Sequence, residues 1–179
     1  MTVSSTVQIS LGFGRSLSYA LVAEAAQVVL DAPVKKTMIP INVTHTAIVT
    51  REIHATLLSS DIPNDSNLGT LPPPKNPLRN TLSTLISYFA AAYKAVFGFD
   101  AGPPLHDALT IAYIAHPEFF ETKRFRVDVE LNGTHTAGET VVDIWDYKRC
   151  DDSWGHAGKN CLVTQQLDVR ETFFLQLSR

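Results

Sequence analysis

A histidine and an aspartate stand side by side directly after a Gly-Pro-Pro turn: His106 and Asp107, followed by the apolar run ALTIAYIAHP. Neighbouring residues on a helix point about 100° apart. One of the pair could therefore bind a hard cation while the other faces an adjoining pocket as a proton donor. A second interpretation fits the same residues: Asp107 caps the helix and offsets its N-terminal partial charge, and His106 packs as a neutral ring. The pair alone does not choose between the two.

A second set of residues of metal-binding types lies nearer the C-terminus, namely Cys150, His156 and Cys161. Their spacing fits no compact zinc motif, and a fourth ligand is not obvious. We therefore expect no zinc site there. Two cysteines also make no disulfide framework, which favours a reducing compartment and a cytoplasmic location.

The composition favours one folded domain and argues against two classes of partner. The chain has 179 residues, of which 45% are apolar and 18% charged, enough apolar surface for a buried core. A net charge of −3 with 15 basic residues provides no basic field for nucleic acid or for an anionic membrane. No apolar run reaches the ~18 residues that a membrane-spanning helix needs.

Apolar periodicity and turn residues predict the elements that must position the His-Asp pair. The strand that follows the first helix after a few residues begins an α/β alternation. The helix after Asp107 is apolar almost all round, so we expect it to be buried between layers. Thr50 is expected to cap one helix, Gly98 to end another, and the five-proline segment 61–77 to form a loop. Helices are expected at 17–30, 51–59, 78–97 and after Asp107, strands at 36–42, 125–131, 140–145 and 161–167, and a short helix at 169–177.

Four stretches follow one another in a distinctive order: AEAAQVVLDAP (23–33), MIPINVTH (38–45), GPPLHDALTIAYIAHPEFFETKRFRVDVELNG (102–133) and GETVVDIW (138–145). Together they resemble the inosine–uridine preferring nucleoside hydrolases, especially the uridine-type eukaryotic members. The resemblance runs from about Ala23 to the C-terminus. It implies an α/β fold class: the C-terminal half of the nucleoside hydrolase fold, with a mostly parallel sheet, flanking helices and a β-hairpin.

The resemblance also implies an activity, the hydrolysis of the N-glycosidic bond of ribonucleosides to ribose and a free base. Carried over by position, His106 matches the histidine beside the leaving base, a candidate general acid, and Asp107 matches a carboxylate that binds Ca²⁺. An oxocarbenium-like transition state needs a metal-held water on one face and a protonated leaving base on the other. The implied partner is a small-molecule nucleoside.

Tyr93 and Phe97 are spaced i, i+4 on the helix that precedes the Gly-Pro-Pro turn. In the family this helix borders the base pocket, so the pair could stack on the base or touch its edge. The same two residues also complete the apolar face of the helix. Residues 42–45 match a strand end and turn of the family, which we interpret as a structural element near the site, with His45 not expected to be catalytic.

The N-terminal residues depart from the family. Nothing in 1–22 resembles the Asp-rich loop that supplies most of the family's calcium ligands, and the segment that clamps the ribose is absent. We expect an unrelated, poorly ordered leader at 1–22 and a partial nucleoside hydrolase domain at 23–179. Because Ca²⁺ takes about six to eight oxygen ligands, we expect weak calcium binding and no hydrolysis above background from this chain alone. The alternative function is a catalytically dead fragment that acts as a binding or interaction module.

An incomplete domain should leave apolar surface uncovered. In the family, the strand at 38–41 pairs with strands of the N-terminal half, so here its edge is expected to be open. The helix at 78–97 has an apolar face wider than the remaining elements could cover. We therefore expect poor solubility or self-association, including assembly into a homo-oligomer.

Overall fold

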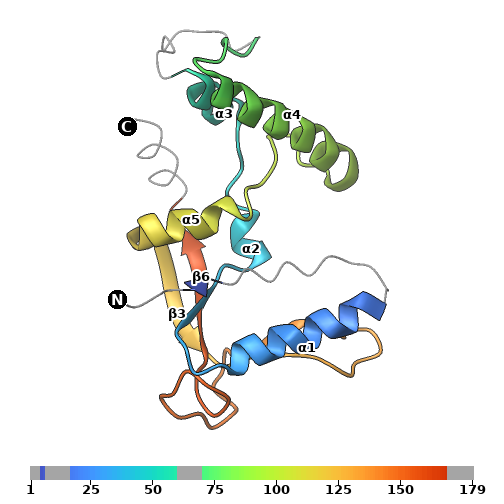
Figure 1. Cartoon of the computed structure of the whole chain (residues 1–179), viewed down its shortest axis with the longest axis vertical. Helices are drawn as coiled ribbons and strands as arrows, with labels where there is room; N and C mark the ends of the chain where they lie inside the picture. Colours follow the sequence, from blue (N-terminus) through green and yellow to red (C-terminus); the bar gives the residue numbers. More distant parts are fainter. Residues whose placement is uncertain (1–4, 7–16, 60–69, 169–179) are drawn as a thin grey trace.

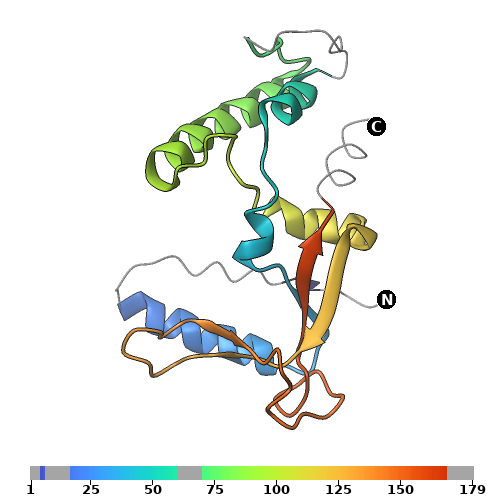
Figure 2. The ribbon, with the colours of Figure 1, turned by 180° about the vertical axis from the view of Figure 1, so that it is seen from behind.

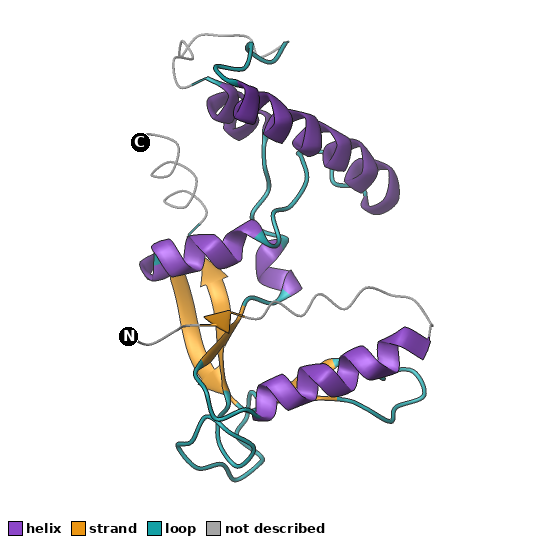
Figure 3. Cartoon of the chain, viewed as in Figure 1, coloured by secondary structure: helices purple, strands orange, loops and turns teal. Residues whose placement is uncertain are grey.

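The computed structural model describes residues 5–6, 17–59 and 70–168 (Figure 1). Strands and helices alternate only at the start of the chain; three further helices then follow one another, and four strands complete the described residues (Figure 3). The segment 169–177, expected to be helical, lies outside the described residues. The elements are β1 Ser5–Thr6, α1 Leu17–Asp31, β2 Lys36–Met38, α2 Ile41–Thr44, α3 Arg51–Leu58, α4 Pro77–Phe97, α5 Ala108–Ala115, a 3₁₀ turn Pro117–Phe119, β3 Phe120–Phe125, β4 Val127–Val129, β5 Thr140–Val142 and β6 Cys161–Leu167.

The main sheet has the strand order β1-β2-β6-β3. Strands β1, β2 and β6 run parallel, with Thr37 opposite Leu162, and β3 joins antiparallel, with Phe125 opposite Cys161. The predicted α/β class with a mostly parallel sheet is thus confirmed. The expected open edge at 38–41 is wrong, because β2 lies between β1 and β6 and residues from Ile41 onward leave the sheet.

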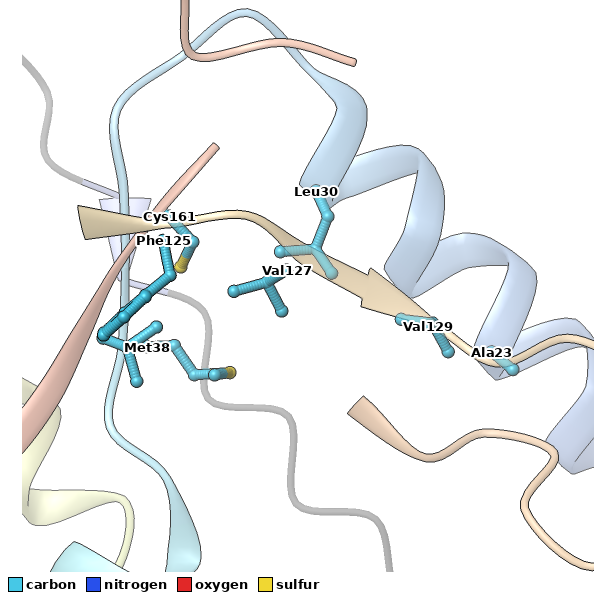
Figure 4. Close-up of a cluster of buried hydrophobic side chains, with 8 residues drawn as sticks. Ala23, Leu30, Met38, Phe125, Val127, Val129 and Cys161 are labelled. Atoms are coloured by element: carbon cyan, nitrogen blue, oxygen red, sulfur yellow. The ribbon is translucent and has the colours of Figure 1, made fainter. Parts of the chain in front are cut away.

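Helix α1 packs beside a two-stranded antiparallel hairpin formed by β4 and β5 (Figures 1 and 2). The hairpin and its long loop were predicted from the sequence. Apolar side chains from α1, β4 and the end of the main sheet meet in one cluster, as the close-up shows (Figure 4). Val127 is fully buried at its centre. The cluster consists of Ala23, Leu30, Met38, Phe125, Val127, Val129, Cys161 and Val163.

A buried arginine ties the hairpin to the irregular segment 143–160. Arg126 is 2% exposed, and its guanidinium donates hydrogen bonds to Asp128, to Asp31 at 3.2 Å and to the carbonyl of His156 at 2.5 Å. Nearby, the buried Lys36 donates to three backbone carbonyls, including that of Trp154 at 2.9 Å. Because buried charges are costly unless they are paired and hydrogen-bonded, this network holds the segment in one place.

A second apolar cluster joins α2, α5 and the 3₁₀ turn above the end of the sheet. Leu109 and Ala112 of α5 are buried in it, whereas Ile111 and Ile114 are 67% and 57% exposed. The prediction that this helix is buried between layers is therefore wrong in this structure, since only one of its faces is covered.

Helices α3 and α4 form an arm that extends away from the sheet (Figures 1 and 2). The Thr50 hydroxyl caps α3 by accepting from the Ile53 amide, and Gly98, with φ of 74°, ends α4 in the left-handed region that favours glycine. Two backbone segments connect the arm to the body. They pair through the Val49 amide to the Pro103 carbonyl and the Leu105 amide to the Ala47 carbonyl, each at 2.9 Å.

Two local predictions need correction. The expected strand 36–42 ends at Met38, and residues 41–44 form the short helix α2. The strand expected to begin at Phe125 is preceded by β3, which starts at Phe120 and pairs along β6. Both differences arise from tertiary contacts, because α2 packs on the α5 cluster and β3 owes its extended form to its neighbour strand. No helix in the described part of the chain is both long enough and apolar enough to cross a membrane.

Candidate functional site

His106 lies where the arm meets the body, and both of its ring nitrogens are within hydrogen-bonding distance of a hydroxyl. Nδ1 is 2.8 Å from Thr44 Oγ1, and Nε2 is 2.9 Å from Tyr93 Oη. Thr44 comes from α2 in the body and Tyr93 from α4 in the arm. The predicted site residues His106 and Tyr93 are thus brought into direct contact.

Local backbone structure explains this placement. The backbone bridge between Leu105 and Ala47 brings the residue before His106 beside the end of α2. The His106 carbonyl accepts from the Leu109 amide at 3.1 Å, so His106 stands at the first turn of α5. The His106 backbone is therefore held by an ordered turn, and its ring by two hydroxyls, one at each nitrogen.

Aromatic rings surround His106 on the arm side. The ring of Tyr93 lies 5.4 Å from that of Phe97 and 5.8 Å from that of Phe99, measured between centroids. The His45 ring lies 5.5 Å from His106 and 5.2 Å from Phe99. Phe97 is 66% exposed, so its ring presents a free apolar surface beside Tyr93. We call His45, Tyr93, Phe97, Phe99 and His106 the aromatic cluster.

The surroundings of His106 disfavour its charged form. Burial lowers the pKa of the ring, the nearby His45 lowers it further, and the opposing pull of the Asp107 carboxylate does not outweigh them. At neutral pH the ring is therefore mostly neutral, with one nitrogen as donor and the other as acceptor.

Asp107 is exposed and has a helical backbone conformation, and its side chain makes no capping hydrogen bond to α5. Asp107 thus stands at the N-cap position of α5, but its side chain does not make the hydrogen bond that the helix-cap interpretation expects. Among the described residues, no group of three or more His, Cys, Asp or Glu side chains is placed to hold a metal ion. One carboxylate is far from the about six to eight oxygen ligands of Ca²⁺, so these residues do not by themselves make a calcium site.

The expectation of no zinc site at Cys150, His156 and Cys161 stays a prediction. Cys161 is buried in the apolar cluster, and burial raises the pKa of its thiol to about 12. A zinc ligand must be a thiolate, which this environment disfavours.

Sequence reasoning missed three residues of the site. Thr44 and His45 were interpreted only as part of a nearby structural element, and Phe99 was not considered. A buried threonine 62 residues from the histidine leaves no local signal, because only the fold brings the two together. Phe99, which follows the helix-ending Gly98, could have been noticed as one more aromatic residue close to Tyr93 and Phe97 in the sequence.

Comparisons with known proteins identify the family. The family model of the inosine-uridine preferring nucleoside hydrolases matches residues 22–174. A probable ribonucleoside hydrolase of Dictyostelium discoideum is 36% identical over 155 residues, which cover 87% of this chain and 41% of that protein. A pyrimidine-specific ribonucleoside hydrolase, RihA, of Klebsiella pneumoniae is 32% identical over 155 residues, which cover 86% of this chain and 42% of that protein.

A comparison with solved structures finds the same fold. The purine-preferring ribonucleoside hydrolase from Gardnerella vaginalis superposes with a TM-score of 0.64 at 21% identity, over 86% of this chain and 41% of that structure. The chain thus spans about two fifths of the length of the relatives it matches. On the family match over most of its length, the chain belongs to the inosine-uridine preferring nucleoside hydrolase family.

Proposed function

We propose that this chain contributes the leaving-group side of a ribonucleoside hydrolase, which cleaves the N-glycosidic bond of a uridine- or inosine-type nucleoside. The observation that carries the proposal is the His106 ring, hydrogen-bonded at Nε2 to Tyr93 within a group of aromatic rings. A planar base fits beside such rings, and Tyr93 and Phe97 are the side chains we assign to contact it.

In this reaction the C1′–N bond breaks, the base leaves with the bonding electrons, and water gives its hydroxyl to C1′ and its second proton to the solvent, from which the His106 ring is protonated. The departing nitrogen needs a proton, which His106 delivers directly or through the Tyr93 hydroxyl. General acid catalysis of this kind contributes about 10²- to 10⁴-fold. The lowered pKa of His106 favours the neutral ring at rest, so the ring must take up a proton before it can give one.

Calcium forms part of the proposal only through Asp107. The exposed Asp107 carboxylate stands next to His106 and would supply one oxygen ligand. The other ligands must come from residues beyond the described set. A calorimetric titration with Ca²⁺ that compares the unsubstituted chain with Asp107→Asn tests this role of Asp107. Weak Ca²⁺ binding that the substitution abolishes supports the role, and equal Ca²⁺ binding by the two proteins contradicts it.

A second candidate function is an interaction module without turnover. Two observations favour it: the described residues lack a complete set of metal ligands, and α4 presents an uncovered apolar face. We expect the chain alone, with Ca²⁺ present, to release no ribose from uridine or inosine above background. Turnover that a chelator abolishes would overturn this expectation.

A cytoplasmic location, which was inferred from the presence of only two cysteines, remains a prediction.

A hybrid protein tests the catalytic proposal. In it, residues 22–174 replace the matching part of the Dictyostelium relative. We expect the hybrid to hydrolyse uridine, and His106→Ala to lower kcat by about 10²- to 10⁴-fold. Tyr93→Phe tests the phenol hydroxyl while keeping the ring. An active hybrid in which His106→Ala is near neutral would refute the general-acid role.

A further inference from the structure

Thr44 is the buried partner of His106. It is 0% exposed, and its hydroxyl oxygen is 2.8 Å from His106 Nδ1 and 3.1 Å from the carbonyl oxygen of Ile41, three residues earlier. The opposite nitrogen of the ring, Nε2, faces the Tyr93 hydroxyl at 2.9 Å. A carbonyl, two hydroxyls and one imidazole therefore form a single chain of hydrogen bonds from α2 to α4.

Donor and acceptor counting restricts where the proton of the neutral ring can lie. A hydroxyl donates one hydrogen bond and accepts up to two, and neutral imidazole donates at one nitrogen and accepts at the other. If Nδ1 carries the proton, it donates to Thr44, Thr44 donates to Ile41, and Tyr93 donates to Nε2, which makes three bonds. If Nε2 carries the proton, Thr44 must donate to Nδ1 and the bond to Ile41 is lost, which leaves two.

Burial makes this difference matter. Water cannot reach the Thr44 oxygen to replace a missing partner, and unsatisfied hydrogen-bonding capacity in a buried site costs free energy. The identity of the hydroxyls favours the same arrangement, because a phenol is the more acidic donor and an aliphatic hydroxyl the better acceptor. Both arguments place the proton on Nδ1.

We propose that Thr44 is a positioning residue that holds neutral His106 in the Nδ1–H form and so leaves Nε2 to accept from Tyr93. Any further proton that the ring takes up then resides on Nε2, on the side of the aromatic cluster rather than on the side of the core. The use of that proton in nucleoside cleavage rests on the proposed function, but the position of the ring proton does not.

The same helical turn supplies a matched control. Thr46 is exposed, and its hydroxyl donates to the carbonyl of Val43, three residues earlier, at 2.7 Å. Thr44 and Thr46 thus make the same kind of bond to the backbone, but only Thr44 also meets the ring. Thr44→Val and Thr46→Val remove the same atom, and Thr44→Ser keeps the hydroxyl.

Nitrogen-15 NMR of the labelled full chain measures the ring proton directly. At a pH where the ring is neutral, the protonated nitrogen and the bare nitrogen give widely separated shifts, and His106→Asn assigns the signals. We expect His106 of the unsubstituted chain to carry its proton on Nδ1. Thr44→Val should shift the ratio of the two forms towards Nε2–H by about two- to tenfold, the range expected for one hydrogen bond. Thr44→Ser should restore the original ratio, and Thr46→Val should leave it unchanged.

Several outcomes would overturn the proposal. A proton on Nε2 in the unsubstituted chain does so without any variant, which keeps the test decisive even if Thr44→Val fails to fold. A ratio that Thr44→Val leaves unchanged and Tyr93→Phe reverses would assign the control to Tyr93 instead. Because none of these readouts uses a nucleoside, failure of this proposal and failure of the hydrolase proposal are distinguishable.

Discussion

The body and the arm of this molecule differ in how their apolar residues are used. In the body, every residue of β2 is buried, and Val127 and Leu109 are 0% and 1% exposed. In the arm, none of the 21 residues of α4 is buried, although that helix is capped at both ends and has a regular apolar face. Caps and periodicity therefore define a helix without defining what covers it.

The uncovered face of α4 is the largest apolar feature of the arm. Its exposed residues recur at spacings of three and four, which places most of them on one side of the helix. The relatives have more than twice the length that this chain matches, and an apolar face of this size is typical of an interaction surface. The expectation of self-association, and of a homo-oligomer, remains a prediction. The exposed large apolar residues of α4 are Leu78, Leu82, Leu85, Tyr88, Phe89, Val96 and Phe97.

The largest effect is expected from the buried arginine of the body. Arg126→Ala removes the guanidinium that Asp31 and Asp128 share, and each lost hydrogen bond between charged groups costs about 1.5–3 kcal/mol. In the arm, Arg79 donates to the Leu57 carbonyl at 2.7 Å, and Arg79→Ala should cost only about 1 kcal/mol. Urea unfolding followed by near-UV circular dichroism measures both. Equal costs would mean that body and arm do not differ as described.

A matched pair of leucines sharpens the comparison. Leu109 in α5 is 1% exposed and Leu85 in α4 is 50% exposed. Leu109→Ala should lower the free energy of unfolding by about 2–5 kcal/mol, whereas Leu85→Ala should change it by less than about 0.5 kcal/mol. If Leu85→Ala proves as costly as Leu109→Ala, α4 is covered in solution, and sedimentation of the same sample shows whether a second copy covers it.

A pH effect is expected at the junction of the two arm helices. His54 of α3 is buried, its Nε2 lies 2.8 Å from Ser83 Oγ of α4, and burial lowers its pKa, with Arg51 contributing. In the unfolded chain, the His54 ring takes up a proton near pH 6.5. The unfolded state thus binds more protons, and the arm loses stability as the pH falls through that value towards the lower folded-state pKa.

Hydrogen exchange of the α3 amides at pH 7 and pH 5.5 measures this loss of stability, and His54→Gln isolates the contribution of the one ring. Faster opening at pH 5.5 that His54→Gln diminishes is the expected result. The same pH dependence in both proteins would assign the effect to another group.

A charge placed on the uncovered face of α4 is expected to have the smallest effect on stability. Its effect on assembly should be clear. Leu85→Glu should leave the free energy of unfolding almost unchanged and reduce any self-association seen by sedimentation velocity. Val141→Glu, at a 53% exposed position of the β4–β5 hairpin, is the matched control. Equal effects of the two changes on assembly would remove α4 as the interface.

Local signals predicted many of the elements. The Thr50 cap placed the start of α3, Gly98 placed the end of α4, and the strand expected at 161–167 is β6, Cys161–Leu167. Where neighbours decide the outcome, the same signals failed. Residues 41–42 read as strand and form helix, β3 begins at Phe120 because β6 lies beside it, and α5 has an exposed face despite its apolar composition.

By itself, the sequence determined the family and the α/β class, because these rest on residue types in a fixed order along the chain, and it predicted a role for His106. Only the tertiary structure decided what His106 touches. Thr44 and Tyr93 lie 62 and 13 residues away, and they reach the two ring nitrogens because the paired backbone segments at Ala47 and Leu105 bring α2, α4 and α5 to one point. A hydrogen bond depends on distance and direction in space, and neither is written in the local order of residues.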